Sequence, residues 1–146
     1  MLVVAMLACA TGCGGSGTPP STQPTGPAPF DLTGKWSGTA TDSSGPGQMT
    51  WQVTQQNGAT FSGTLSMTDT TANVTGTGAV SGSVSASSVS FSLAIPAGGF
   101  GGRSASCTAS ASGTAQASSS QLTGTYAGSN SCSGAITSGQ FTLSRQ

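Results

Sequence analysis

Residues 32–41 read LTGKWSGTAT, and polar and apolar side chains alternate along them. Because successive side chains of a β-strand point to opposite faces, Gly34, Trp36, Gly38 and Ala40 share one face. That face carries a large indole among residues with little or no side chain, whereas the opposite face is wholly polar. Since glycine permits a strand to bend, we predict the first strand of a sheet that curls over its own core. Trp36 is then either an ordinary core residue or part of a binding site.

Similar alternating runs continue towards the C-terminus, with turns between them and no helical periodicity of any length. Asn57 and Gly58 both tolerate positive φ, so this pair predicts a hairpin turn. The apolar positions change parity between Ile136 and Phe141, which predicts a bulge or turn at 138–139. The expected strands are 34–41, 49–54, 59–67, 74–84, 89–95, 104–116, 122–126 and 136–143.

This pattern of about eight strands with short connections predicts an all-β fold, an eight-stranded antiparallel up-and-down barrel. A barrel of that size is wide enough for its own side chains or for one small ligand. Closure also removes bare sheet edges, which are a hazard in a chain with so little charge. A β-sandwich is the alternative, because spacing alone does not give the strand order.

The composition limits the classes of function. The chain has 146 residues, the length of one domain, of which only 4% are charged; the formal net charge is +0 and there is no histidine. A nucleic-acid-binding protein would carry a basic stripe, so that class is excluded. The polarity comes from Ser, Thr, Gly, Gln and Asn, a composition common in β-rich proteins outside the cytoplasm.

Catalysis is not expected of this chain. An enzyme needs a poised acid, base or nucleophile, yet the only acidic residues are Asp31, Asp42 and Asp69. All three lie in turn-like contexts, where aspartate commonly hydrogen-bonds its own backbone. Lys35 falls on the outer face of the first strand, and no hydrolase or phosphate-binding motif is present. An enzyme would become plausible only if two of these aspartates met in a cleft.

The first residues resemble an export signal. Residues 2–8 form an apolar run, far shorter than the roughly 20 residues that span a bilayer, and typical of a secretion signal. The small residues of 10–12 precede Cys13, and this resembles the bacterial lipobox. The resemblance implies cleavage after residue 12, lipidation of Cys13 and a lipid anchor in the bacterial cell envelope, at the outer membrane or cell surface. No Lys or Arg precedes the run, Ala10 replaces the usual leucine, and Cys9 is a rival lipidation site.

A tether is expected next. Residues 13–29 mix flexible Gly and Ser with extended Pro-rich sequence. We therefore divide the chain into a signal peptide (1–12), a lipidated tether (13–29) and a barrel domain (30–146). A lipid on one cysteine would hold the domain at a membrane surface without a transmembrane helix. A secreted protein with a Pro-rich leader is the alternative.

Two cysteines remain, Cys107 and Cys132. An even pair in an exported domain predicts a disulfide. It would join the sixth strand to the start of the eighth, and closing that loop would stabilise the fold by about 3–4 kcal/mol. A metal or redox pair is a weak alternative, since the spacing is not CxxC and no histidine could complete a zinc site. No cofactor is expected.

The segment 32–36, LTGKW, resembles the opening of the avidin barrel, which belongs to the calycin group with its G-x-W start. The turn at 57–58 and the sequence FSGT at 61–64 are similar to the following hairpin and third strand. The resemblance covers little more than the first third of the domain and implies the same small barrel. Gly38 replaces the asparagine that holds biotin in avidins, and Leu65 replaces their third-strand tyrosine. The resemblance therefore implies the barrel without a biotin site.

Inward-facing aromatic side chains are the candidate ligand-binding residues. They are Trp36, Trp51, Phe61, Phe91 and Tyr126. The inward glycines around them leave either a cavity for a small apolar ligand or only the room that a narrow, filled barrel needs. A second candidate is the loop that holds Phe100 between glycine pairs next to Arg103, since aromatic and Arg side chains are common anchors for partners. Its alternative is a disordered loop whose Phe100 folds back onto the barrel mouth.

These observations predict a bacterial envelope lipoprotein whose barrel binds, without catalysis, a small apolar ligand or a partner at the barrel mouth. The alternative is a structural or adhesive envelope protein with a filled core and no ligand. The two hypotheses differ in whether the inward glycines leave a void.

Overall fold

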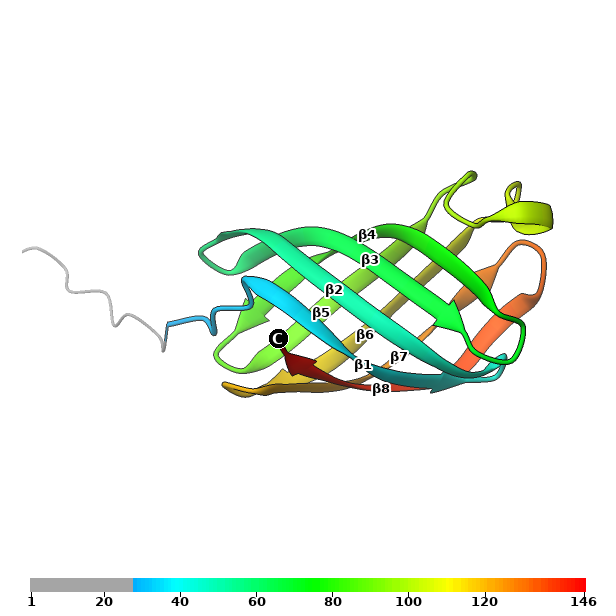
Figure 1. Cartoon of the computed structure of the whole chain (residues 1–146). Helices are drawn as coiled ribbons and strands as arrows, with labels where there is room; N and C mark the ends of the chain where they lie inside the picture. Colours follow the sequence, from blue (N-terminus) through cyan, green and yellow to red (C-terminus); the bar gives the residue numbers. More distant parts are fainter. Residues whose placement is uncertain (1–27) are drawn as a thin grey trace, which may run out of the picture.

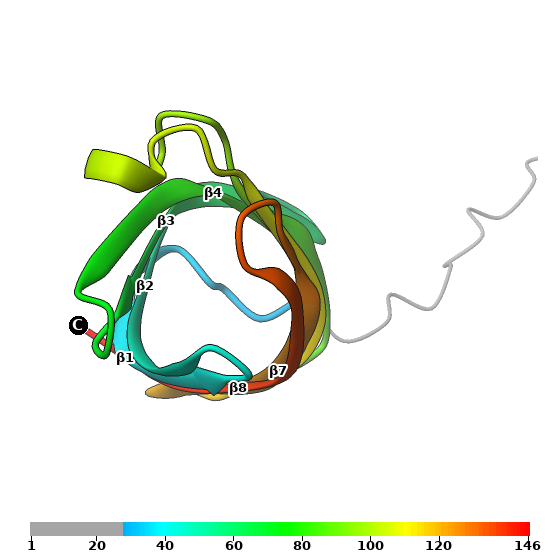
Figure 2. The ribbon, with the colours of Figure 1, turned by 90° about the vertical axis from the view of Figure 1, so that its right-hand side faces the viewer.

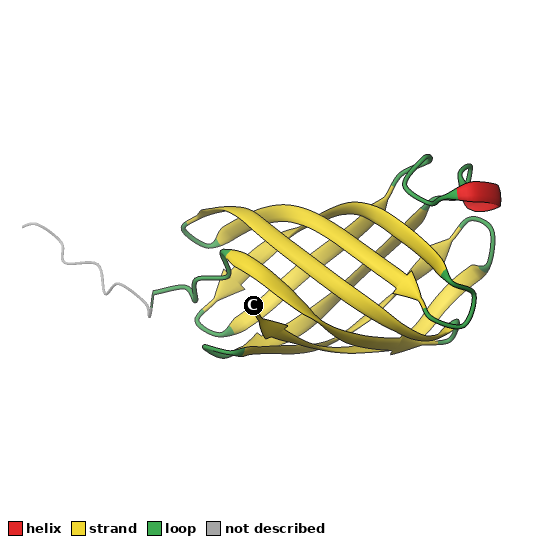
Figure 3. Cartoon of the chain, viewed as in Figure 1, coloured by secondary structure: helices red, strands yellow, loops and turns green. Residues whose placement is uncertain are grey.

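The alternating runs form eight strands, each hydrogen-bonded to its neighbours in the chain (Figures 1 and 3). The computed structural model describes residues 28–146. The strands are β1 (Gly34–Asp42), β2 (Gly45–Asn57), β3 (Thr60–Asp69), β4 (Val74–Ser85), β5 (Ser88–Ile95), β6 (Ala109–Ala117), β7 (Gln121–Asn130) and β8 (Gly134–Arg145). β1 pairs antiparallel with β8, which closes the barrel. The predicted eight-stranded antiparallel barrel is confirmed, and the sandwich alternative is wrong.

The alternation of side chains decides which face is the core. Along β5 every second residue is buried, so valine, phenylalanine, leucine and isoleucine point inward while the serines between them are exposed. Trp36 and Ala40 of β1 are buried in the same way, and Lys35 is exposed on the outer face. No helix within residues 28–146 is long and apolar enough to cross a membrane.

The predicted irregularity in the last strand is confirmed. Ile136 and Gly139 of β8 pair with Gly128 and Tyr126 of β7, so β8 carries one extra residue between these two pairs. Ser138 lies there with φ of 55°, a backbone conformation typical of a bulge. The extra residue restores the inward direction of the side chains that follow.

The sixth strand was predicted over 104–116, and its start is wrong. β6 begins only at Ala109, because residues 102–104 form a 3-10 turn (η1, Gly102–Ser104) and 105–108 continue the loop. Gly102 has φ of 60°, which turns the chain away from the sheet. The predicted hairpin at 57–58 is confirmed, with Gly58 at φ 56° between β2 and β3.

Aromatic rings fill the middle of the barrel. The ring centroid of Trp51 lies 4.9 Å from that of Phe91, 5.4 Å from that of Phe141 and 6.4 Å from that of Phe61. Tyr126 packs on Phe141 at 6.3 Å. These five residues, here called the aromatic midsection, are each 4% exposed or less. Ring pairs at such distances add to the gain from burying their area.

The inward glycines of this region make room for rings. A Cβ atom built on Gly113 would lie 2.7 Å from Cζ of Phe91, and one on Gly124 would lie 2.8 Å from Cζ of Phe141. Real Cβ atoms do not approach other carbons so closely. In the midsection, therefore, the glycines relieve crowding and leave no void.

The segment before β1 closes one end of the barrel, here called the closed end. Figure 2 looks in from the other end, and this segment crosses the far opening. Leu32 is fully buried, and the indole Nε1 of Trp36 donates a hydrogen bond to its carbonyl oxygen at 2.8 Å. Gln56 holds the segment with both ends of its amide, accepting from the N–H of Leu32 and donating to the carbonyl of Phe30. These contacts hold the segment across the closed end of the barrel.

Arg145, near the C-terminus, fixes the same closed end. Its guanidinium carbon lies 4.5 Å from the Trp36 ring centroid, a cation–π geometry. The guanidinium also donates hydrogen bonds to the carbonyl oxygens of Thr33 and Asp31. One side chain thus ties the last strand to the segment that precedes the first.

The tight fit of the midsection predicts the effect of one added methyl group. Gly113→Ala is expected to lower the free energy of unfolding by about 1–3 kcal/mol, because the methyl would meet the Phe91 ring and the Thr125 carbonyl. Gly101→Ala is the matched control, since nothing lies within 4 Å of its Cβ position and its φ is −82°. Urea unfolding followed by tryptophan fluorescence measures both. Equal stability of the two variants would mean that the midsection is loosely packed.

Candidate ligand-binding site

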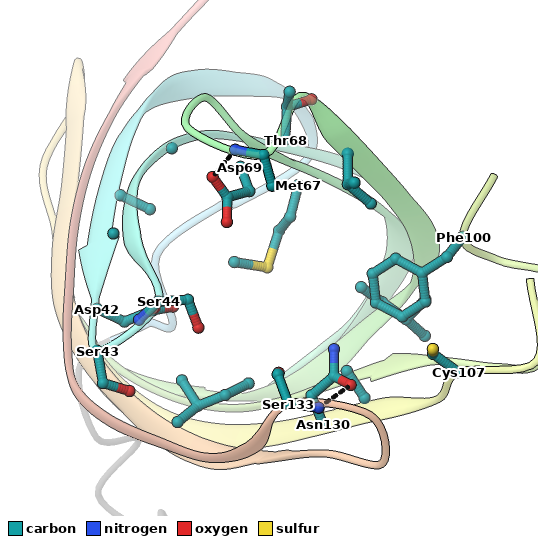
Figure 4. Close-up of a pocket in the computed structure, with 18 of the residues that line it drawn as sticks. Asp42, Ser43, Ser44, Met67, Thr68, Asp69, Phe100, Cys107, Asn130 and Ser133 are labelled. Atoms are coloured by element: carbon teal, nitrogen blue, oxygen red, sulfur yellow. Dashed lines mark hydrogen bonds between the residues drawn. The ribbon is translucent and has the colours of Figure 1, made fainter. Parts of the chain in front are cut away.

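A cavity of about 620 Å³ lies at the end of the barrel opposite the closed end (Figure 4). Its rim is made by the connections β1–β2, β3–β4, β5–β6 and β7–β8, which gather at this end in Figure 1. The volume is within the roughly 300–1,000 Å³ typical of small-molecule sites. We call it the mouth cavity.

The walls of the mouth cavity are largely apolar. Met67 extends into its middle in Figure 4. Ile95, Phe100, Tyr126 and Ile136 are among the other lining residues. These side chains offer an unoccupied apolar surface directly above the aromatic midsection, to which Tyr126 also belongs. A small apolar group would find there the contacts that it lacks in water.

Phe100 reaches this wall because its loop folds back over β4. Phe100 forms an isolated antiparallel bridge with Gly76, and the N–H of Thr77 donates to the carbonyl of Gly99 at 2.8 Å. A Cβ on Gly76 would collide with the Phe100 ring, so the glycine is what admits it. The alternative in which Phe100 folds onto the barrel mouth describes this arrangement. Arg103 is exposed on η1 and does not line the cavity.

The rim of the mouth cavity is polar and acidic. Asp69 ends β3, and its Oδ1 accepts hydrogen bonds from the N–H groups of Thr71 at 2.7 Å and Ala72 at 2.9 Å. Asn130 ends β7 and accepts from the N–H of Cys132 at 2.8 Å. These bonds are the expected turn interactions of Asp and Asn. They fix the direction in which each side chain faces the cavity.

Asp42 joins the rim to the wall. Its Oδ1 accepts from the N–H of Ser44 at 2.7 Å, which is the predicted bond to its own turn. Its Oδ2 accepts from the hydroxyl of Tyr126 at 2.8 Å, across 84 positions of sequence. Burial, and then the hydrogen bond to the Asp42 carboxylate, raise the pKa of Tyr126 far above its ordinary value. The phenol is therefore held neutral, as a hydrogen-bond donor.

A disulfide braces two of the rim connections. Cys107 and Cys132 are bonded, with their Cα atoms 5.7 Å apart, as predicted. Both lie in connections and not within strands, because β6 begins two residues after Cys107 and β8 two residues after Cys132. Both cysteines line the mouth cavity. The bond therefore links the loop that carries Phe100 to the β7–β8 turn.

Of the five aromatic residues predicted to bind a ligand, only Tyr126 lines the mouth cavity. Trp51, Phe61 and Phe91 belong to the midsection below it, and Trp36 lies at the closed end. Parity along a strand tells which residues point inward, but it does not tell how deep in the barrel they lie. The predicted set of ligand-binding residues therefore includes four that do not line the mouth cavity.

Two rim residues were missed, although parity contains a signal for them. Asp42 continues the inward row of Trp36 and Ala40, and Asp69 continues that of Leu65 and Met67. From the sequence both are interpreted as turn residues, and as a catalytic pair only if two aspartates meet in a cleft. They come from β1 and β3 and pair with Gly45 and Gly47 of β2, so their backbones lie two strands and two residues apart in the sheet. Both line the mouth cavity.

The arrangement is suited to holding a molecule. Within residues 28–146 no group of three or more His, Cys, Asp or Glu could hold a metal ion. The two cysteines among these residues are bonded to each other. What remains is an apolar pocket with hydrogen-bond acceptors at its rim, which is the usual composition of a small-molecule site.

Tyr126 is the only tyrosine of the chain, so its ionisation can be followed directly. Free tyrosine ionises near pH 10, and we expect no tyrosinate absorbance there in the folded protein because its pKa is raised. The unfolded state does ionise there and so binds fewer protons. The contribution of Tyr126 to stability is therefore constant below about pH 10 and falls above it. Tyrosinate absorbance that appears near pH 10 in the native protein would contradict the raised pKa.

Asp42→Asn should lower the pKa of Tyr126 only in part, since burial is the larger cause of the shift.

Replacing both Cys107 and Cys132 by serine is expected to lower the free energy of unfolding by about 3 kcal/mol, because the unfolded chain regains the freedom of a closed loop. Urea unfolding measures the loss. The original protein with reductant should match the variant, and reductant should leave the variant unchanged. A variant as stable as the oxidised protein would show that the bond contributes nothing.

No protein-family model and no curated protein matches this sequence. Small barrels of solved structure are similar to it. One is EF1p2_mFAP2b bound to DFHBI, with a TM-score of 0.62 and 18% identity, covering 79% of this chain and 94% of that chain. A redesigned β-barrel, mFAP1, also bound to DFHBI, has a TM-score of 0.53 and 23% identity over 78% of this chain and 94% of its own. A third, the redesigned β-barrel b11L5F_LGL, has a TM-score of 0.52 and 20% identity over 79% and 91%.

At these identities the likeness establishes a shared fold and nothing more. The chain forms a small eight-stranded antiparallel barrel like those proteins. The resemblance to avidins and calycins stays a prediction. The predicted signal peptide, Cys9, Cys13 and all but the last two residues of the tether lie outside the described residues.

Proposed function

We propose that the barrel binds a small, partly apolar molecule in the mouth cavity and performs no chemistry on it. One observation carries this proposal: an open space of about 620 Å³ with apolar walls lies above a midsection that is already filled. Met67, Ile95 and Phe100 all line this space. Burial of apolar surface would drive binding at roughly 25 cal/mol per Å².

The site is held open before a ligand arrives. The aromatic midsection forms a solid floor, the disulfide braces two rim connections, and the bond between Asp42 and Tyr126 ties the rim to the wall. A preorganised site spends less of its binding energy on ordering. The two similar barrels solved with DFHBI support the proposal in one respect, since a barrel of this size accommodates a small molecule in those proteins.

We also propose that the protein is a lipoprotein of the bacterial cell envelope, anchored through Cys13. The support is the lipobox-like sequence and the Pro-rich segment after it. The chain enters the barrel at the closed end, so a tether attached there would leave the mouth cavity facing away from the membrane (Figure 1). Mass spectrometry of the protein from a bacterial host, with and without Cys13→Ser, tests the anchor.

A neutral fluorescent probe, N-phenyl-1-naphthylamine, tests the cavity. We expect saturable one-to-one binding to the purified protein, because the cavity has the volume of a small-molecule site and Met67 and Phe100 line it. Met67→Trp should fill the space and weaken binding by at least about tenfold, a loss of roughly 1.4 kcal/mol. Ser92→Trp, which places the same ring on the exposed face of β5, is the matched control and should leave binding unchanged.

The competing hypothesis is a structural or adhesive envelope protein without a ligand, and the filled midsection favours it. Under that hypothesis neither the probe nor any molecule from the host binds saturably. Native mass spectrometry of the protein purified from a bacterial periplasm would then show the bare mass alone. Probe binding that Met67→Trp leaves intact would place the probe outside the mouth cavity and argue against the proposed site.

A further inference from the structure

The charges that line the mouth cavity are all of one sign. Asp42 and Asp69 are among its lining residues, whereas no lysine, arginine or histidine is. In a chain with only three acidic residues, two of them face the same cavity. Neighbouring apolar walls reduce solvent screening, so these charges act more strongly on a molecule inside the cavity than they would on an open surface.

The positive charges of the chain lie elsewhere. The sequence has three, on Lys35, Arg103 and Arg145. Arg145 is engaged at the closed end by Trp36 and two backbone carbonyls, and Lys35 is exposed on the outer face of β1. Arg103 belongs to the open end, but it is exposed on η1 and outside the cavity lining. No side-chain cation therefore offsets the two carboxylates within the cavity.

One carboxylate oxygen of Asp69 is free to accept a hydrogen bond from a ligand. Its Oδ1 accepts both turn hydrogen bonds, whereas Oδ2 accepts none from the residues that the structure describes. Both oxygens of Asp42 are occupied, by the N–H of Ser44 and by the hydroxyl of Tyr126. Figure 4 shows the Asp69 carboxylate directed into the cavity, on the same side as Met67. Asp69 can thus contact a ligand directly, while Asp42 contributes its charge.

From this distribution we infer that the ligand of the mouth cavity is a small organic cation: an apolar or aromatic body that carries a protonated amine. This inference rests on the proposed function. The ammonium group donates to Oδ2 of Asp69, and the body packs on Met67 and the ring of Phe100. A charge-assisted hydrogen bond is about twice as strong as a neutral one. An anion of the same shape is disfavoured by both aspartates.

Three probes that share one body separate the head group from the apolar contact: 1-naphthylmethylammonium, 1-naphthylmethanol and 1-naphthoate. Their affinities for the purified protein at pH 7 are measured by isothermal titration calorimetry. We expect the ammonium to bind about tenfold more tightly than the alcohol, the factor that a hydrogen bond to a charged group commonly provides, and the carboxylate to bind least. Added salt should shrink the preference, because the rim is partly exposed.

Asp69→Asn should remove most of the preference for the ammonium over the alcohol, with Asp42 accounting for the remainder, and should leave the affinity for the alcohol unchanged, since the amide keeps an oxygen for the turn bonds. Asp31→Asn is the matched control, because Asp31 makes a similar turn bond to the N–H of Thr33 at the closed end. It should leave all three affinities unchanged. Should Asp69→Asn fail to fold, the salt dependence and Asp42→Asn, which should reduce the preference by a smaller factor, test the same inference.

The outcomes separate the inference from the proposed function. If the alcohol binds and the ammonium binds no better, or if the preference is undiminished in Asp69→Asn, the cation inference is overturned while the ligand-binding function stands. If no probe binds with any head group, both fall. A preference that largely disappears in Asp69→Asn and persists in Asp31→Asn supports the assignment to Asp69.

Discussion

An eight-stranded barrel has a narrow bore, and this chain places five aromatic rings in the middle of it. They fit because glycines on the neighbouring strands take the positions where a Cβ would collide with a ring, as at Gly113, the partner of Phe91 on β6. Ring and glycine are thus two parts of one packing arrangement. The rest of the molecule depends on it, since a packed midsection makes the two ends of the barrel independent of each other.

The two ends of the barrel differ: one is covered by the chain and the other is open. At the closed end the segment before β1 covers the opening, and Arg145 binds it to Trp36 and to the last strand. At the open end four connections form a rim without covering the bore, and the disulfide and the bond between Tyr126 and Asp42 keep that rim in place. A cavity persists there because the largest rings lie below it and the loops do not close over it.

Because only 4% of the residues are charged, each charged side chain contributes a large share of the protein's electrostatic field. The exterior of strands such as β5 is covered with serine hydroxyls, and the described exterior owes little of its polarity to ions. Against that background two carboxylates in one cavity form the strongest electrostatic feature of the open end. Their effect on a bound molecule comes from position, because both face the same cavity, and it weakens with added salt because the rim is partly exposed.

Much of the fold was determined by the sequence alone, because β-structure is encoded in a local period of two. Alternation identified the strands and the inward row of Trp36 and Ala40, and its change of parity identified the bulge at Ser138. The pair Asn57 and Gly58 predicted the turn, and the two remaining cysteines predicted their own bond. The site was decided only by the tertiary structure. Depth along the barrel, which separates Tyr126 from Phe91, depends on how far each strand is staggered against its neighbours, and no local pattern records that. Likewise, Asp42 and Asp69 were recognisable as turn residues, but only closure of the barrel brought both to the rim of one cavity, since that requires strands distant in sequence to meet.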